Sequence, residues 1–98
     1  MNGIASGNSA HAEGTNTIAG PAEEAPTVNS NTEVGNFAHA EGNGTWASGN
    51  SAHAEGKKTT ASGPYSHAEG YSTIASGNKG HAEGHITQAT GDSAHAEG

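Results

Sequence analysis

Small residues alternate with larger, more polar residues along almost the whole chain. In Thr45-Trp46-Ala47-Ser48-Gly49 and in Ala52-His53-Ala54-Glu55-Gly56, every second residue is Ala, Thr or Gly. A period of two is that of an extended strand, whose successive side chains point to opposite faces. The pattern therefore predicts short β-strands with one face of small side chains and one face of large ones.

The alternation is organised into a repeat of 14 residues. Its clearest marker is the tetrapeptide His-Ala-Glu-Gly, which begins at His11, His39, His53, His67, His81 and His95. A short fixed period is typical of stacked identical units. The 98 residues equal seven periods. We therefore expect one all-β domain over residues 1–98, a parallel β-solenoid (β-roll) of seven 14-residue coils with two short strands each.

The size of the side chains predicts which face lies inside. Counting each unit from 1 to 14, starting at Met1, we place columns 3, 5, 10 and 12 inward and columns 4, 6, 11 and 13 outward. The opposite choice would bury a His and a Glu in almost every coil, which is costly. Each half-unit is read as five extended residues and a two-residue turn. Since the inward residues are mostly Ala and Thr, a single chain has little core, and we expect further chains around it.

The repeat is interrupted at residues 20–34. Pro21 and Pro26 lack the N–H that a β-ladder requires. Two interpretations are open: a loop that leaves the ladder, which we favour, or a distorted coil packed on a neighbour. A functional alternative is a subunit contact or a recognition feature on the shaft.

Composition excludes several classes of protein. The formal net charge is −7, with three Lys or Arg in total and no Cys. So few basic residues argue against nucleic-acid binding. The sequence contains no apolar run long enough to cross a membrane, and no signal peptide is visible. Ser, His and Glu recur in parallel columns and do not converge on one pocket. We therefore expect no enzyme and no cofactor.

His and Glu share one strand face because columns 11 and 13 are two residues apart. Stacked coils would turn them into a ladder of His11, Glu13, His39, Glu41, His53, Glu55, His67, Glu69, His81, Glu83, His95 and Glu97. We favour a structural ladder in which Glu of one rung or chain satisfies His of another. The alternative is metal binding, although rungs about 4.8 Å apart are too distant to share a tetrahedral ion without a second chain.

The ladder face is also our candidate for the contact between chains, because its residue types do not drift from repeat to repeat. The competing candidate is column 4, which is more apolar. Four aromatic residues are possible ligand contacts, since exposed rings stack on sugars. They are Phe37, Trp46, Tyr65 and Tyr71. For these we favour ordinary packing near turns.

The half-unit with the pattern x-x-small-x-Ala-x-Gly resembles the head repeats of trimeric autotransporter adhesins. The segments 45–49 and 52–56 fit it directly, and paired forms are similar to repeats in prophage tail-type proteins. The resemblance covers nearly the whole chain outside residues 20–34. It implies a left-handed β-roll with three chains side by side, exposed outside the cell or on a cell or virion surface. In this chain the outward columns carry His and Glu, where that family often has apolar residues.

These observations together predict a structural fibre or an adhesive shaft. Both ends of the chain read as ordinary coils, whereas solenoids usually carry polar caps. Either the chain is part of a longer protein, or its coils stack head to tail into a filament. The expected partners are the chain itself, as homotrimer or filament, and a cell-surface glycan or matrix. The alternative function is a glycan- or metal-binding recognition module, as in a phage tail fibre or an adhesin head.

Overall fold

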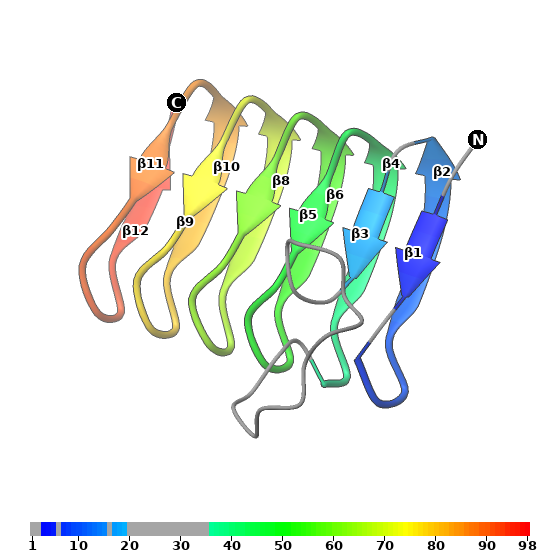
Figure 1. Ribbon diagram of the computed structural model, residues 1–98. Helices are drawn as coiled ribbons and strands as arrows, with labels where there is room; N and C mark the ends of the chain where they lie inside the picture. The colour runs from blue at the N-terminus through cyan, green and yellow to red at the C-terminus, as the bar shows by residue number, and fades with distance from the viewer. Residues whose placement is uncertain (1–2, 6, 16, 20–35) are drawn as a thin grey trace.

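A computed structural model describes residues 3–5, 7–15, 17–19 and 36–98, and these residues form two parallel six-stranded sheets (Figure 1). The short-strand sheet contains, in spatial order, β1 (Gly3–Ala5), β3 (Thr17–Ala19), β5 (Trp46–Ala47), β7 (Thr60–Ala61), β9 (Ile74–Ala75) and β11 (Gln88–Ala89). The long-strand sheet contains β2 (His11–Thr15), β4 (His39–Asn43), β6 (His53–Lys57), β8 (His67–Tyr71), β10 (His81–His85) and β12 (His95–Glu97). The predicted all-β parallel solenoid is confirmed. Among these residues, no helix has the length and apolar character needed to cross a membrane.

Residues one period apart lie opposite each other. His53 pairs with His67 and Ala54 pairs with Ala68, in parallel register. One step differs, because His11 pairs directly with His39, and the neighbouring sheet skips the same 14 residues. The prediction of seven coils was therefore wrong: the described residues build six. The expected loop at residues 20–34 lies outside the described residues.

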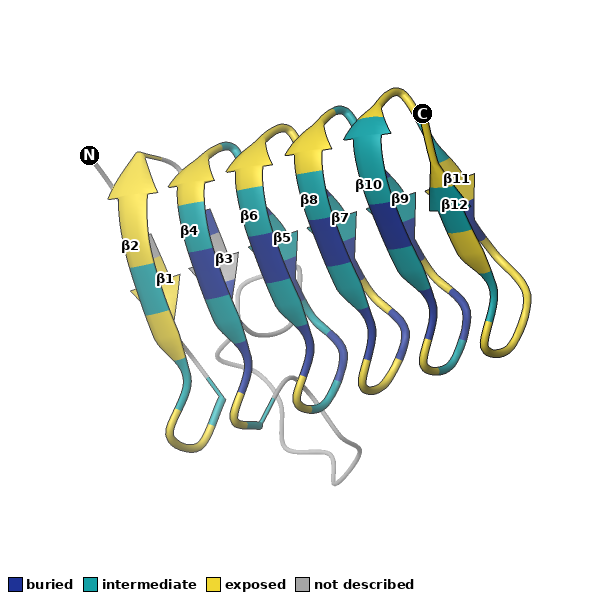
Figure 2. Ribbon diagram, turned by 180° about the vertical axis from the view of Figure 1, so that it is seen from behind, coloured by how far each residue is buried: buried dark blue, intermediate teal, exposed yellow. Residues whose placement is uncertain are grey.

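The space between the sheets is filled by small side chains, as the alternation predicted. Every buried hydrophobic residue among the described residues is an Ala, and the buried polar ones are Thr or Ser. In β8, for example, Ala68 is fully buried, whereas His67 and Glu69 on either side of it face outward. Figure 2 shows this buried stripe running through the middle of successive strands. Such a core brings the two sheets close together and leaves the charged side chains of the described residues outside.

The two half-units are less alike than expected. The strands β4, β6, β8 and β10 have five residues, but β5, β7, β9 and β11 have only two. In the short-strand sheet, the amides of Ser62 and Gly63 both donate to the carbonyl of Ala75, at 3.0 and 3.3 Å. Because two consecutive backbone amides share one carbonyl, the regular hydrogen-bond pairing between the strands ends there. The expectation of five extended residues in each half-unit therefore holds only for the long-strand sheet.

Glycine is required where neighbouring coils approach most closely. A Cβ atom built on Gly63 would lie 2.2 Å from the carbonyl oxygen of Gly77 in the next coil. Positive φ angles occur elsewhere: at the column 14 glycines, such as Gly70 (φ 111°), and in columns 2 and 9, mostly at residues that are not glycine, such as Tyr65 (φ 60°) and Ile86 (φ 57°). In column 9 this residue is third in a four-residue turn closed by a hydrogen bond from Ser66 N to Gly63 O, 3.1 Å. A positive φ at that position is what a type II turn requires.

Candidate functional site

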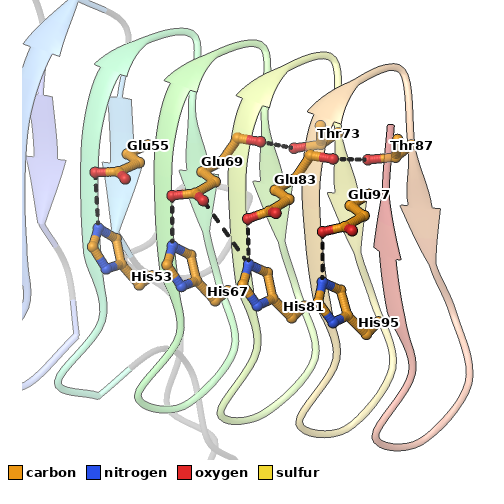
Figure 3. Close-up of polar contacts among 10 residues, drawn as sticks. All are labelled: His53, Glu55, His67, Glu69, Thr73, His81, Glu83, Thr87, His95 and Glu97. Atoms are coloured by element: carbon orange, nitrogen blue, oxygen red, sulfur yellow. Dashed lines mark hydrogen bonds and ion pairs between the residues drawn. The ribbon is translucent and has the colours of Figure 1, made fainter.

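Six His side chains form a continuous stack along the outer face of the long-strand sheet. Each precedes an Ala that is buried, or partly buried in the two end rungs, and the strand period places the His outward together with the Glu two residues later. Ring centroids of neighbouring rungs are 4.7 to 4.8 Å apart, and the ring planes differ by 1° to 14°. The structure thus brings together all twelve residues of the predicted ladder. Figure 3 shows its last four rungs.

Each His contacts the Glu of its own rung. The distance from His Nε2 to Glu Oε1 is 3.2 Å for His39 with Glu41 and 3.6 Å for His53 with Glu55. One contact also joins neighbouring rungs: Nε2 of His81 lies 4.0 Å from Oε2 of Glu69 (Figure 3). We expected Glu of one rung or chain to contact His of another; within this chain most of the contacts lie inside a rung, and His81 with Glu69 joins two rungs. A side-chain pair at positions i and i+2 is already close enough to interact along one strand.

The middle of the ladder is half-buried although it lies on an outer face. The side chains of His67 and Glu69 are 36% and 33% exposed. Burial lowers the pKa of His67, and the neighbouring imidazoles of His53 and His81 lower it further; the nearby carboxylates oppose this. The pKa of Glu41 is also lowered, first by a side-chain hydrogen bond with Glu13 in the adjacent rung. These surroundings therefore favour the neutral imidazole of His67 and the ionised carboxylate of Glu41.

An open groove runs beside the Glu column. It has a volume of about 730 Å³ and is lined by Glu55, Gly56, Glu69, Gly70, Glu83, Gly84, Glu97 and Gly98. The glycines contribute no side chains to the groove, so its charged groups are the four carboxylates. This acidic groove is absent from the sequence-based predictions, because it depends on strands that continue through the Gly of column 14. The regular Glu-Gly step in each repeat was its only sequence signal.

The four aromatic residues do not come together. Phe37 and Tyr65 project from the turns of column 9 and are 62% and 59% exposed. Trp46 belongs to β5 in the opposite sheet and is partly buried. Tyr71 ends β8, where its ring is tilted against His85 at 5.2 Å. A single sugar-binding site built from all four is therefore inconsistent with the fold.

Column 1 forms a small mixed cluster that sequence reasoning missed. Nζ of Lys57 lies 5.9 Å from the centre of the Tyr71 ring, which in turn neighbours His85. These residues end β6, β8 and β10, because the long strands extend one residue beyond the Gly of column 14. The sequence places them in the same column, but the residue types in that column vary too much to predict a cluster.

The outer face of the short-strand sheet is less polar than the ladder. Column 4 places Ile4, Trp46, Thr60, Ile74 and Gln88 there. Ile4 is 47% exposed, and the indole Nε1 of Trp46 is buried without a hydrogen-bond partner among the described residues. Both faces that the sequence offered for contact between chains are therefore outer faces of the solenoid, on opposite sheets.

Repeated outward columns on a thin parallel solenoid define the class: a β-roll repeat protein. The chain matches the family model of the YadA head domain repeat, in two copies, over residues 1–19, 40–66 and 54–79. These ranges include more than half of the chain, which therefore belongs to the YadA head domain repeat family. This confirms the resemblance to adhesin head repeats. Neither the comparison with curated proteins nor that with solved structures gives a match.

Proposed function

We propose that this chain is an adhesin-like structural shaft, without enzymatic activity, exposed at a cell or virion surface. The observation that carries the proposal is the in-register ladder of both sheets, in which residues 14 positions apart pair directly. Such a ladder extends in one direction by adding equal rungs. His, Glu and Ser side chains are repeated along it, which suits a surface presented many times better than one reaction centre.

We further propose that three chains assemble side by side. The core of one chain consists of Ala, Thr and Ser side chains, which bury little apolar area each. Packing outer faces against other chains would add the missing burial. We place the His/Glu ladder at this contact because its middle rungs are already about two-thirds buried, as in His81 with Glu83. The competing contact is the column 4 face with Trp46 and Ile74.

The assembly is tested by measuring molar mass in solution with multi-angle light scattering. One variant replaces all six ladder His by Ala, and a matched variant changes the opposite face by Trp46→Ala and Ile74→Ser. We expect the natural chain to be trimeric and only the His variant to dissociate. Dissociation of the column 4 variant alone would move the contact to the other sheet. A cooperative melt of a monomeric natural chain would contradict the trimer.

Surface adhesion is the finer part of the proposal, with a glycan or a matrix protein as partner. Phe37 and Tyr65 support it, because both project from the same row of turns and are mostly exposed. The test is binding to a glycan array and to matrix-coated plates. The double variant Phe37→Ser and Tyr65→Ser should lose the response, whereas Ser51→Ala in the same row should keep it. Equal binding by both variants would contradict a role for these rings.

Head-to-tail growth is proposed separately. The described ladder has β1 and β2 at one edge and β11 and β12 at the other, and an edge strand can pair with a strand of another molecule. Electron microscopy of concentrated protein should then reveal filaments whose length increases with concentration. Discrete particles of constant length would contradict this part of the proposal but would not affect the proposed shaft function.

A further inference from the structure

We propose that the His/Glu ladder binds divalent transition-metal ions, each held by side chains of two adjacent rungs. The site with the best-defined geometry consists of Glu69, His81 and Glu83. All ligands come from one chain, so this inference does not depend on trimer formation. Neutral imidazole and carboxylate together suit Zn²⁺ and similar ions, whereas Ca²⁺ and Mg²⁺ prefer oxygen ligands alone.

The pair within one rung already has the separation that a tetrahedral ion needs. Ligand atoms about 2.0 to 2.1 Å from a tetrahedral ion lie roughly 3.4 Å from each other. In the last rung but one, Nε2 of His81 and Oε1 of Glu83 are 3.4 Å apart. An ion can therefore bind between these two atoms without movement of the strand.

A third ligand comes from the preceding rung. Oε2 of Glu69 is 4.0 Å from Nε2 of His81, on the side facing the previous strand (Figure 3). A rotation of the Glu69 side chain, whose carboxyl group is partly exposed, closes the remaining gap of about half an ångström. The reach of the carboxylate therefore overcomes the rung spacing, which by itself keeps two stacked imidazoles too far apart for one ion. The fourth position is left for water.

Two features of the site favour an ion over the side chains alone. The Nε2 atoms of His53, His67 and His81 are covered from solvent and have no partner in hydrogen-bonding geometry among the described residues. Each faces a carboxylate at 3.4 to 3.6 Å. The carboxylates also line the open groove, so the oxygen ligands of the site are accessible to an ion. A bound cation would use lone pairs that the free ladder leaves unused.

The repeat predicts how many ions one chain holds. Among the described residues, five groups of three ligand atoms lie within 4.8 Å of one another, and consecutive groups share a residue except for the third and fourth. At most three of them have no residue in common, for example those that contain Glu13, Glu55 and Glu97. Electrostatic repulsion also disfavours ions on consecutive rungs, because the repulsion halves when the separation doubles. We therefore expect three ions per chain.

The experiment is a titration of the natural chain with Co²⁺, whose visible absorption reports tetrahedral coordination, followed by competition with Zn²⁺. One variant replaces the six ladder Glu residues by Gln, which keeps the His stack and the side-chain volumes. The matched controls lie outside the ladder: His85→Gln removes a His, and Asp92→Asn removes a carboxylate. Far-UV circular dichroism verifies that each variant keeps its strands.

We expect saturation at about three Co²⁺ per chain, unchanged in both controls. Affinity should fall at least about tenfold in the Gln variant, since loss of even an outer partner of a metal ligand costs 10- to 100-fold. Unchanged affinity in that variant would mean adventitious binding by imidazole and would overturn the proposal, as would saturation at one ion per rung. A trimer that binds no Co²⁺ would overturn the metal site and leave the proposed shaft function intact.

Discussion

Two buried threonines in the same column should respond in opposite ways to the same substitution. Thr59 and Thr73 are both fully buried between the sheets, one repeat apart. The hydroxyl of Thr73 donates a hydrogen bond to the carbonyl of Glu69 at 3.2 Å. The hydroxyl of Thr59 has no hydrogen-bond partner among the described residues. Replacing each by Val keeps the shape and the β-propensity but removes the hydroxyl.

The magnitudes follow from the cost of burying a polar group. An unsatisfied buried hydroxyl costs about 1 to 3 kcal/mol, whereas a satisfied hydrogen bond contributes about 0.5 to 1.5 kcal/mol. Thr59→Val should therefore raise the free energy of unfolding by about 1 kcal/mol, and Thr73→Val should lower it by about 1 kcal/mol. For a chain of this length, a difference of roughly 2 kcal/mol corresponds to about 10 °C in Tm.

The assay is urea and thermal denaturation followed by far-UV circular dichroism, at one fixed protein concentration because assembly affects stability. Thr45→Val is a repeat of the first case, since the Thr45 hydroxyl also lacks a partner. Effects of equal sign and size at Thr59 and Thr73 would refute the reasoning, because they would mean that the two hydroxyl groups have the same environment.

Three further predictions use single positions. Gly63→Ala should lower the free energy of unfolding by more than about 3 kcal/mol in the same urea assay, because its Cβ would collide with Gly77 of the next coil. Gly91→Ala is the control in the same column. It should be nearly neutral, because no backbone atom lies close to its Cβ position. Ile86→Asn should raise Tm, since a β-branched residue at φ 57° costs about 1 to 2 kcal/mol and the side chain is exposed; a lower Tm would contradict this. The pKa of His67 is lower in the folded chain than in the unfolded chain, so the unfolded chain binds more protons as the pH falls. In chelator-containing buffer, the free energy of unfolding should therefore be highest above pH 6.5 and decrease below it. His67→Gln should reduce this decrease.

The inward and outward faces were predictable because the cost of burying charge and the size of the side chains lead to the same assignment. At His67-Ala68-Glu69, burying the charged pair would be expensive, and the Ala is small enough for closely spaced sheets. The alternation and the 14-residue period are then sufficient to specify the register. Burial and strand pairing therefore follow from residue size and spacing alone, without knowledge of any long-range contact.

The features that were missed depend on geometry that residue types do not encode. Column 9 contains Ser51, Tyr65 and Lys79, which share no preference for a left-handed backbone, yet all adopt it because the turn requires it there. The contact of His with Glu in its own rung depends on side-chain rotamers. The number of coils depends on whether an interrupted repeat stays in the ladder, and two prolines indicate an interruption without saying how far the ladder skips.

The skipped repeat leads to a further prediction about the ladder. Pairing of His11 with His39 and of Ile18 with Trp46 passes over one full period, so the columns keep their phase across the interruption. Deleting residues 20–33 would join Ala19, in column 5, to Val34, in column 6, and restore an uninterrupted 14-residue unit. The six described coils should then remain. Stability should stay the same or rise, by at most roughly 2 kcal/mol from the shorter chain connection.

A deletion of equal length elsewhere provides the control. Removing residues 57–70 also preserves the phase, but it eliminates one rung from each sheet, including β7 and most of β8. Nearest-neighbour contacts stabilise a solenoid, so this variant should lose the contribution of one coil. Equal losses in the two variants, measured by urea denaturation, would mean that residues 20–33 contribute a rung of their own. If the first deletion keeps its stability but loses the molar mass of the assembly, the excised residues act as a subunit contact, because the ladder is then intact while the association between chains is not.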